Sequence, residues 1–173
     1  MDGLPSITLE IKDYLSTQKP DVFCIAETKL REEIHLNFQK EGYKVWRRDK
    51  KRKGGGGVLI MVQEDIFVEG VQYGDDMAKV IRITIQTNGR ERRKVIVTYV
   101  PPKTNTGKLE EYKAMQKVVL KCLGDVMRKD RKVLLAGDFN CKGVNWKEME
   151  GSGNAGSWSE NMLQLAIENT LDQ

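Results

Sequence analysis

Three short runs of consecutive apolar residues constrain the fold of this chain more than any other feature. They are Val22–Ala26, Val58–Val62 and Val133–Ala136, and each is bounded by polar or glycine residues. A run of this length without polar alternation is typical of a strand that is buried on both faces. The chain is therefore expected to fold around at least three buried strands.

Helical and hairpin patterns lie between these runs. Apolar residues at helical spacing predict helices over about 5–18, 31–41, 108–129 and 157–171. Asn88-Gly89 is the strongest hairpin signal, and it predicts antiparallel pairing of residues 80–86 with 94–100. Since no linker or internal repeat interrupts the pattern, we predict one domain over residues 1–173, of mixed α/β class with a partly antiparallel sheet.

The positive charge of the chain is confined to one short segment. The formal net charge is +4, yet Lys44–Lys53 alone holds seven basic residues and one acidic residue, against 22 basic and 24 acidic residues elsewhere. This distribution excludes a uniformly basic coat protein. Such a charge run is usually a solvated loop, but it also permits contact with a nucleic-acid backbone. The candidate residues for that contact are Arg47, Arg48, Lys50, Lys51, Arg52 and Lys53.

Cysteine, histidine and hydropathy each exclude a class of protein. The three cysteines are far apart and odd in number, so neither a disulfide framework nor a zinc finger is expected. The only histidine is His35, and a mechanism that needs a histidine base must use it. No apolar run reaches the ~18 residues that span a bilayer, and no apolar segment opens the chain. We expect an intracellular protein, nuclear or cytoplasmic, with no membrane and no disulfide-linked partner.

Two carboxylates stand at the ends of apolar runs. Glu27 follows the first run, and Asp138 follows the third, with Asn140 two residues further on. Strand ends meet at the edge of a sheet, where a site can form without interrupting the core. Oxygen ligands there suit a hard cation such as Mg²⁺, which is held by one or two carboxylates plus substrate phosphate. The alternative is that Asp138 only makes a turn, and the residue types leave both interpretations open.

Tyr99 and a run of four glycines are weaker signals. Tyr99 precedes Val-Pro-Pro at the end of a predicted strand, where its phenol could donate a hydrogen bond to a phosphate oxygen or simply pack under a loop. The glycines, Gly54–Gly57, are not predicted to be a phosphate loop, because they lead into a strand rather than a helix. They are expected to permit a turn or a close backbone approach.

Four motifs then occur in order: Glu-Thr-Lys at 27–29, Gly-Gly-Gly-Val-Leu-Ile at 55–60, Tyr-Val-Pro-Pro at 99–102 and Gly-Asp-Phe-Asn at 137–140. Together they resemble the endonuclease/exonuclease/phosphatase superfamily. Their spacing and flanking sequence are most similar to the apurinic-type endonuclease domain of non-LTR (LINE-type) retrotransposon polyproteins. The resemblance covers about residues 18–173. It implies a two-sheet α/β sandwich with outer helices, which hydrolyses phosphodiester bonds with Mg²⁺ or Mn²⁺.

The same resemblance implies a role for each candidate residue. Glu27 would be the metal ligand, and Asp138 would orient or activate the attacking water. Asn140 and Tyr99 would bind the scissile phosphate. DNA would be the substrate, because a retrotransposon domain of this kind nicks chromosomal DNA to prime reverse transcription.

The resemblance also implies missing parts. The family begins with a strand that ends in an asparagine near the metal, and it ends with a strand that carries Ser-Asp-His. Neither is found in residues 1–173, and His35 does not match the second motif by position. We therefore expect an incomplete domain, lacking the first strand and the C-terminal strands, that is weak or inactive as a nuclease.

Two other functions stay open at the level of sequence. One is a non-catalytic nucleic-acid-binding or interaction module that reuses the fold, which the basic segment would serve. The other is a phosphatase of the same superfamily that acts on a small phosphoester or a lipid headgroup. A shared fold does not by itself decide between them.

Overall fold

The computed structural model describes residues 8–30, 41–49, 56–74, 78–87, 91–103, 109–130, 132–153, 156–169 and 171. The chain forms two compact units. The first comprises Met1–Tyr99 and Lys132–Asp138, and the second comprises Val100–Arg131 and Phe139–Gln173. Most of the predicted helix over 31–41 and the predicted turn at Asn88-Gly89 lie outside the described residues.

The first sheet of the first unit has three antiparallel strands in the order β1-β3-β2. They are β1 (Val22–Ala26), β2 (Tyr43–Asp49) and β3 (Gly57–Gln63). The central strand β3 is buried from Gly57 to Val62, which confirms the prediction for that apolar run.

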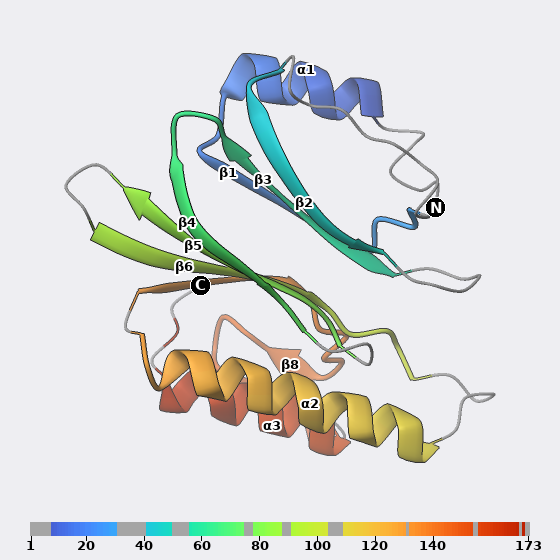
Figure 1. Cartoon of the computed structure of the whole chain (residues 1–173). Helices are drawn as coiled ribbons and strands as arrows, with labels where there is room; N and C mark the ends of the chain where they lie inside the picture. The colour runs from blue at the N-terminus through green and yellow to red at the C-terminus, as the bar shows by residue number, and fades with distance from the viewer. Residues whose placement is uncertain are drawn as a thin grey trace. The chain divides into compact units, whose positions relative to one another are not determined.

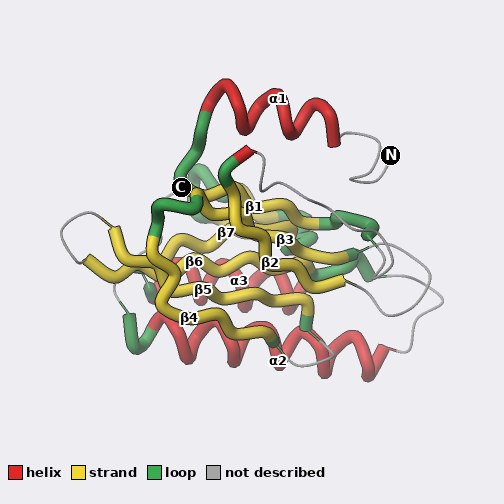
Figure 2. The backbone as a smooth tube through the Cα atoms, turned by 45° about the horizontal axis from the view of Figure 1, so that its top comes forward, coloured by secondary structure: helices red, strands yellow, loops and turns green. Residues whose placement is uncertain are grey.

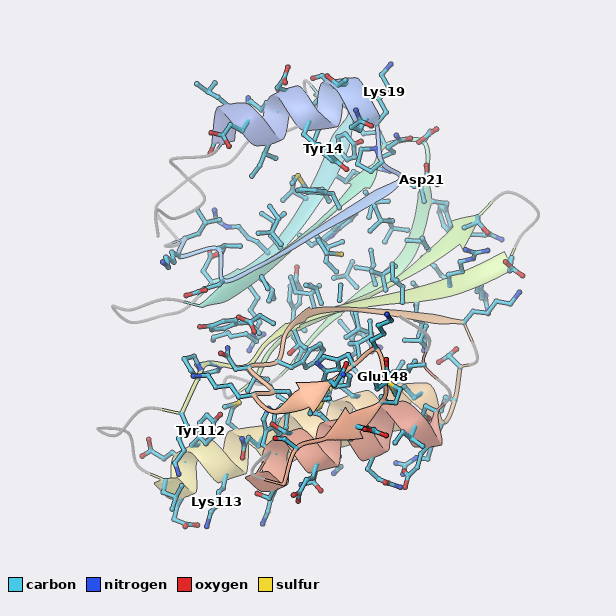
Figure 3. All side chains as sticks on the ribbon, turned by 180° about the vertical axis from the view of Figure 1, so that it is seen from behind. Tyr14, Lys19, Asp21, Tyr112, Lys113 and Glu148 are labelled. Carbon is cyan, nitrogen blue, oxygen red and sulfur yellow. The ribbon has the colours of Figure 1, made fainter. Side chains whose placement is uncertain are left out.

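One helix, α1 (Thr8–Gln18), covers the outer face of this sheet (Figure 1). Its buried residues are Ile11 and Leu15, which pack against side chains of β2 and β3 and confirm the predicted helical spacing. Tyr14 lies on the side of α1 that faces the strands (Figure 3), with its ring centroid 5.5 Å from that of Phe23 on β1.

The second sheet of the first unit has four strands in the order β4-β5-β6-β7 (Figure 2). They are β4 (Phe67–Tyr73), β5 (Lys79–Thr87), β6 (Glu91–Tyr99) and β7 (Val133–Asp138). β5 and β6 pair in antiparallel register, as the hairpin signal predicts. β6 and β7 are parallel.

The core of the first unit lies between these two sheets. The alternating residues Ile81, Ile83 and Ile85 of β5 face it, and so do Val95, Val97 and Tyr99 of β6. They meet the side chains of Val58, Ile60 and Val62 on β3. The predicted two-sheet α/β sandwich is thereby confirmed in this unit.

The sequence did not predict strand β4. Only Val68 and Val71 of this strand pack against the core, and the register with β5 shifts between Val68 and Gly70. A bulge of this kind adds a residue and breaks the two-residue alternation that identifies a strand. The strand can therefore be identified only from its pairing with β5 in the structure.

The prediction that β1 and β7 are buried on both faces is wrong for β7 and only partly confirmed for β1, whose alternate residues pack against the hydrophobic clusters on its two opposite faces. Every residue of β1 is partly exposed, and Leu134 of β7 is 55% exposed. Within the described residues, both are edge strands of their sheets. An apolar run indicates that a strand packs against a core, but it does not indicate whether that strand is central or at the edge of its sheet.

The second unit contains two helices and a short hairpin. α2 (Leu109–Met127) and α3 (Gly156–Glu168) agree with the helices predicted over 108–129 and 157–171, and they pack against each other (Figure 1). The hairpin of β8 (Val144–Asn145) and β9 (Glu150–Gly151) lies between β7 and α3 in the sequence. Among the described helices, none is long and apolar enough to cross a membrane.

Candidate functional site

Tyr99 and Asp138 are neighbours at the ends of two parallel strands. Their Cα atoms are partners in the register of β6 and β7, at the last position of each strand. Residues in register on adjacent strands project from the same face of a sheet. Since Tyr99 is part of the core between the sheets, Asp138 projects toward the same side.

Gly137 allows β7 to approach β6 at this point. Its φ is +149°, and a Cβ atom there would lie 3.0 Å from the carbonyl carbon of Thr98 and 3.1 Å from its nitrogen. Backbone atoms of a paired strand cannot move aside, so only glycine fits. Gly137 and Asp138 are therefore the last residues of a strand rather than a turn, and their register places the carboxylate beside Tyr99.

Glu27 follows β1 in a backbone conformation that few residues adopt. Its φ is +56°, and that of Lys29 is +53°. For residues other than glycine this left-handed region costs about 1–3 kcal/mol, and it persists only where surrounding contacts enforce it. Between these two residues, the amide N–H of Thr28 donates a hydrogen bond to the carbonyl oxygen of Gly57, with an N–O distance of 3.2 Å. The chain thus turns away from β1 at Glu27 and is tied to the start of β3.

Burial and the two carboxylates all raise the pKa of the Tyr99 phenol. The residue is only 5% exposed, and burial raises the pKa of Tyr99 above its ordinary value of 10.0. The negative charges of Glu27 and Asp138 raise this pKa further, because both disfavour the phenolate. The register of Tyr99 with Asp138, together with the contacts of Gly56 with Tyr99 and of Thr28 with Gly57, places the three predicted residues near one another in the first unit. The phenol keeps its proton as a hydrogen-bond donor at neutral pH.

Two glycines at the start of β3, Gly56 just before the strand and Gly57 as its first residue, pack against this group of residues. Gly56 has a φ of +101°, and a Cβ atom there would lie 2.6 Å from Cε1 of Tyr99. A Cβ atom at Gly57 would overlap the hydroxyl group of Thr28. The predicted close approach is confirmed at these two positions, while Gly54 and Gly55 lie outside the described residues. The sequence reasoning did not single out Thr28, although it is part of the Glu-Thr-Lys motif.

Asn140 belongs to the second unit. Its φ is +48°, and its Nδ2 donates a hydrogen bond to the carbonyl oxygen of Val100 at 2.8 Å.

Trp158 makes a hydrogen bond next to Asn140 in the sequence. Its Nε1 donates to the carbonyl oxygen of Phe139, also at 2.8 Å. Trp158 was not among the candidate residues predicted from the sequence. The available signal was that a buried indole N–H usually finds an acceptor.

The basic segment is described only in part. Arg47 and Arg48 are half-buried and belong to strand β2. Nε of Arg47 lies 3.0 Å from Oδ2 of Asp49, so its charge is partly offset. Lys50, Lys51, Arg52 and Lys53 lie outside the described residues. The contact of these residues with nucleic acid therefore stays a prediction.

Solved structures share this fold. A variant of the 3′ phosphatase NExo from Neisseria, bound to a product DNA hairpin, is 20% identical over 94% of this chain and 67% of its own, with a TM-score of 0.73. An AP endonuclease from Archaeoglobus fulgidus is 24% identical with the same coverages and a TM-score of 0.64. The catalytic domain of human nocturnin is 16% identical over 79% of this chain and 57% of its own, with a TM-score of 0.58. This chain thus spans about two thirds or less of these proteins, and at such identities the likeness establishes the fold alone.

Comparison with curated proteins finds no match. The sequence profile of the endonuclease/exonuclease/phosphatase family, however, matches residues 8–147. That range contains Glu27, Tyr99, Asp138 and Asn140, and it makes up most of the chain. Membership supports hydrolysis of phosphodiester bonds, of the nuclease or phosphatase type, as the general chemistry. The chain belongs to the endonuclease/exonuclease/phosphatase family.

Proposed function

We propose that residues 1–173 form a single domain that cleaves phosphodiester bonds of DNA with a divalent metal ion, Mg²⁺ or Mn²⁺. We further propose that it is the endonuclease domain of a non-LTR (LINE-type) retrotransposon, as its four motifs suggest. The observation that carries the proposed chemistry is the proximity of Glu27, Tyr99 and Asp138 in the first unit, which follows from the β6–β7 register and from the contacts of Thr28 and Gly56 at the start of β3. The DNA hairpin bound to NExo supports DNA as the substrate class.

The two carboxylates fit a hard divalent cation. Glu27 and Asp138 are both half-buried, so they are accessible to an ion and to substrate. Mg²⁺ is usually held by one or two carboxylates plus water and substrate phosphate. It therefore needs fewer protein ligands than a group of three or more His, Cys, Asp or Glu side chains, which the described residues do not contain. Bound through Glu27, the cation would polarise a phosphoryl oxygen and offset the charge that develops on it.

The other residues would bind the phosphate and move a proton. Tyr99 would donate its phenolic hydrogen to a phosphate oxygen, and its raised pKa keeps that hydrogen in place. Asp138 would accept a hydrogen bond from the attacking water and then its proton. Asn140, two residues later, would donate an amide N–H to the phosphate, while its bond to Val100 fixes the orientation of the amide.

We expect turnover by this chain alone to be slow. A histidine that transfers a proton typically contributes a factor of about 10² to 10⁴ to a rate. The described residues around Tyr99 provide no imidazole, and the only histidine of the sequence is His35. The proton required by the leaving oxygen would then come from water.

The experiment is nicking of supercoiled plasmid under single-turnover conditions, with protein in excess over DNA. The unmodified chain should nick slowly in Mg²⁺ or Mn²⁺ and stop when a chelator is added. Glu27→Gln and Asp138→Asn should each lower the rate at least about 100-fold. The control is Glu110→Gln, at an exposed position of α2. Nicking that persists without metal, or in both site variants, would contradict the proposal, and so would a complete lack of nicking.

Non-catalytic binding of nucleic acid is the second candidate function, and the run of basic residues that begins at the end of β2 favours it. Replacing Lys50, Lys51, Arg52 and Lys53 by Gln should weaken DNA binding. The plot of log binding constant against log salt concentration should also become less steep, by roughly 0.9 in slope for each phosphate that is no longer neutralised. Glu27→Gln should leave binding unchanged. Fluorescence anisotropy at several salt concentrations measures both effects, and binding that is indifferent to the four replacements removes this candidate.

A further inference from the structure

Thr28 and Gly57 are in unusually close contact. Thr28 is 1% exposed, and a Cβ atom at Gly57 would overlap its hydroxyl oxygen. The same Cβ atom would also lie 3.3 Å from the carbonyl oxygen of Arg48. The side chain of Thr28 therefore occupies the space that any larger residue at position 57 would need.

Hydrogen bonding by its hydroxyl group does not explain the role of Thr28. Among the described residues, its oxygen has no hydrogen-bond partner, although it is buried. A buried hydroxyl without a partner is destabilising, because it has lost its bonds to water. What Thr28 contributes at this position is thus its shape and its backbone.

The backbone around Thr28 is held in a strained conformation. Glu27 and Lys29, on either side of it, both have positive φ. Residues in this conformation relax unless their neighbours prevent it. The contacts that prevent it here are the side chain of Thr28 against Gly57 and the bond from its amide N–H to the carbonyl oxygen of Gly57.

We propose that Thr28 is a positioning residue, which locks onto Gly57 and thereby holds the carboxylate of Glu27 at the edge of the sandwich where Tyr99 and Asp138 end their strands. This inference rests on the proposed role of Glu27 as the metal ligand. It assigns a function to the threonine of the Glu-Thr-Lys motif and to the last glycine of the glycine run. In this proposal, Thr28 and Gly57 are both needed to hold the carboxylate of Glu27, which follows β1, in the correct position.

The test is the affinity of the full chain for Mn²⁺, measured by titration calorimetry. Glu27→Gln is the reference, and it should weaken binding at least ten-fold. Gly57→Ala and Thr28→Ala should do the same. Thr28→Val keeps the shape and should bind within two-fold of the unmodified chain. Gly70→Ala is the matched control, because a Cβ atom there meets nothing within 4 Å.

A second readout needs no metal. Hydrogen exchange of the Thr28 amide, followed by NMR, should be at least ten-fold faster in Gly57→Ala and Thr28→Ala, and unchanged in Thr28→Val and Gly70→Ala. If Gly57→Ala does not fold, Thr28→Ala decides the question.

The outcomes separate the two proposals. If Glu27→Gln binds Mn²⁺ as tightly as the unmodified chain, the proposed role of Glu27 fails. If Glu27→Gln weakens binding but Gly57→Ala and Thr28→Ala bind like Gly70→Ala, the positioning role alone is overturned. Loss of affinity in Thr28→Val would also overturn it, because the hydroxyl and not the shape would then be required.

Discussion

The aromatic ring of Tyr99 lies directly against the backbone of Gly56. A methyl group on Gly56 would be 2.6 Å from Cε1 of the ring and 2.9 Å from Cδ1, and the φ of Gly56 is +101°. The residue before β3 thus fixes the position of the phenol on β6, although the two are 43 positions apart in the sequence. The glycine run serves the candidate site by permitting close packing, not by cradling a phosphate.

Gly56→Ala should therefore destabilise the chain by about 1–3 kcal/mol, through overpacking and an unfavourable φ. Urea unfolding measures the change. Gly70→Ala on β4 is the control and should change stability by less than about 1 kcal/mol, because its surroundings are open. Equal unfolding midpoints for the two variants would contradict the packing described for Tyr99.

The raised pKa of Tyr99 links stability to alkaline pH. The folded chain holds the phenolic proton more tightly than the unfolded chain, in which the pKa has its ordinary value of 10.0. This contribution to stability is complete below pH 10.0 and is lost as the pH rises through the folded-state pKa.

Glu27→Gln should lower the pKa of Tyr99, because one of the two negative charges is removed. The phenolate absorbance, with the titration of Tyr99→Phe subtracted, isolates this residue from the other tyrosines. An unchanged titration would mean that Glu27 lies too far from the phenol to act on it.

Cys24 should be nearly inert toward alkylating reagents. Burial raises the pKa of its thiol to about 11 from an ordinary value of 9.0, so the reactive thiolate is roughly 100-fold rarer at neutral pH. Mass spectrometry after a short iodoacetamide pulse measures its labelling in the folded chain and in the same chain unfolded by urea. Equal labelling of Cys24 in both states would show that β1 does not bury it.

Trp158→Phe should cost about 1 kcal/mol, since it removes the donor to the carbonyl oxygen of Phe139 and keeps most of the packing. Urea unfolding provides the measurement. A variant that is as stable as the unmodified chain would indicate that water replaces the indole N–H without loss.

The parts of the fold that follow local patterns were predictable. The buried strand β3, the β5–β6 hairpin and the spacing of Ile11 and Leu15 on α1 each follow from a short stretch of sequence. The bulged strand β4 was not predictable, because its bulge hides the alternation. The edge positions of β1 and β7 were also beyond prediction, since they depend on which strands pair.

The candidate site divides in the same way. Glu27, Tyr99 and Asp138 could each be placed at a strand end from the sequence. Tyr99 and Asp138 are brought together by the parallel register of β6 with β7, and Glu27 is brought near them by the bond from Thr28 to Gly57 at the start of β3. No local pattern encodes either long-range contact. The contact of Thr28 with Gly57 is likewise a tertiary fact, and only the glycine run hinted at it.

The central claim is that Glu27 and Asp138 serve the same reacting phosphate, and a double-mutant cycle on the single-turnover nicking rate tests it most directly. Groups that act as a unit are strongly non-additive, so removing one already includes the effect of removing the other. Glu27→Gln, Asp138→Asn and the double variant should all nick at similarly low rates. A double variant whose rate falls by the product of the two single effects would contradict the account, because the two carboxylates would then act independently.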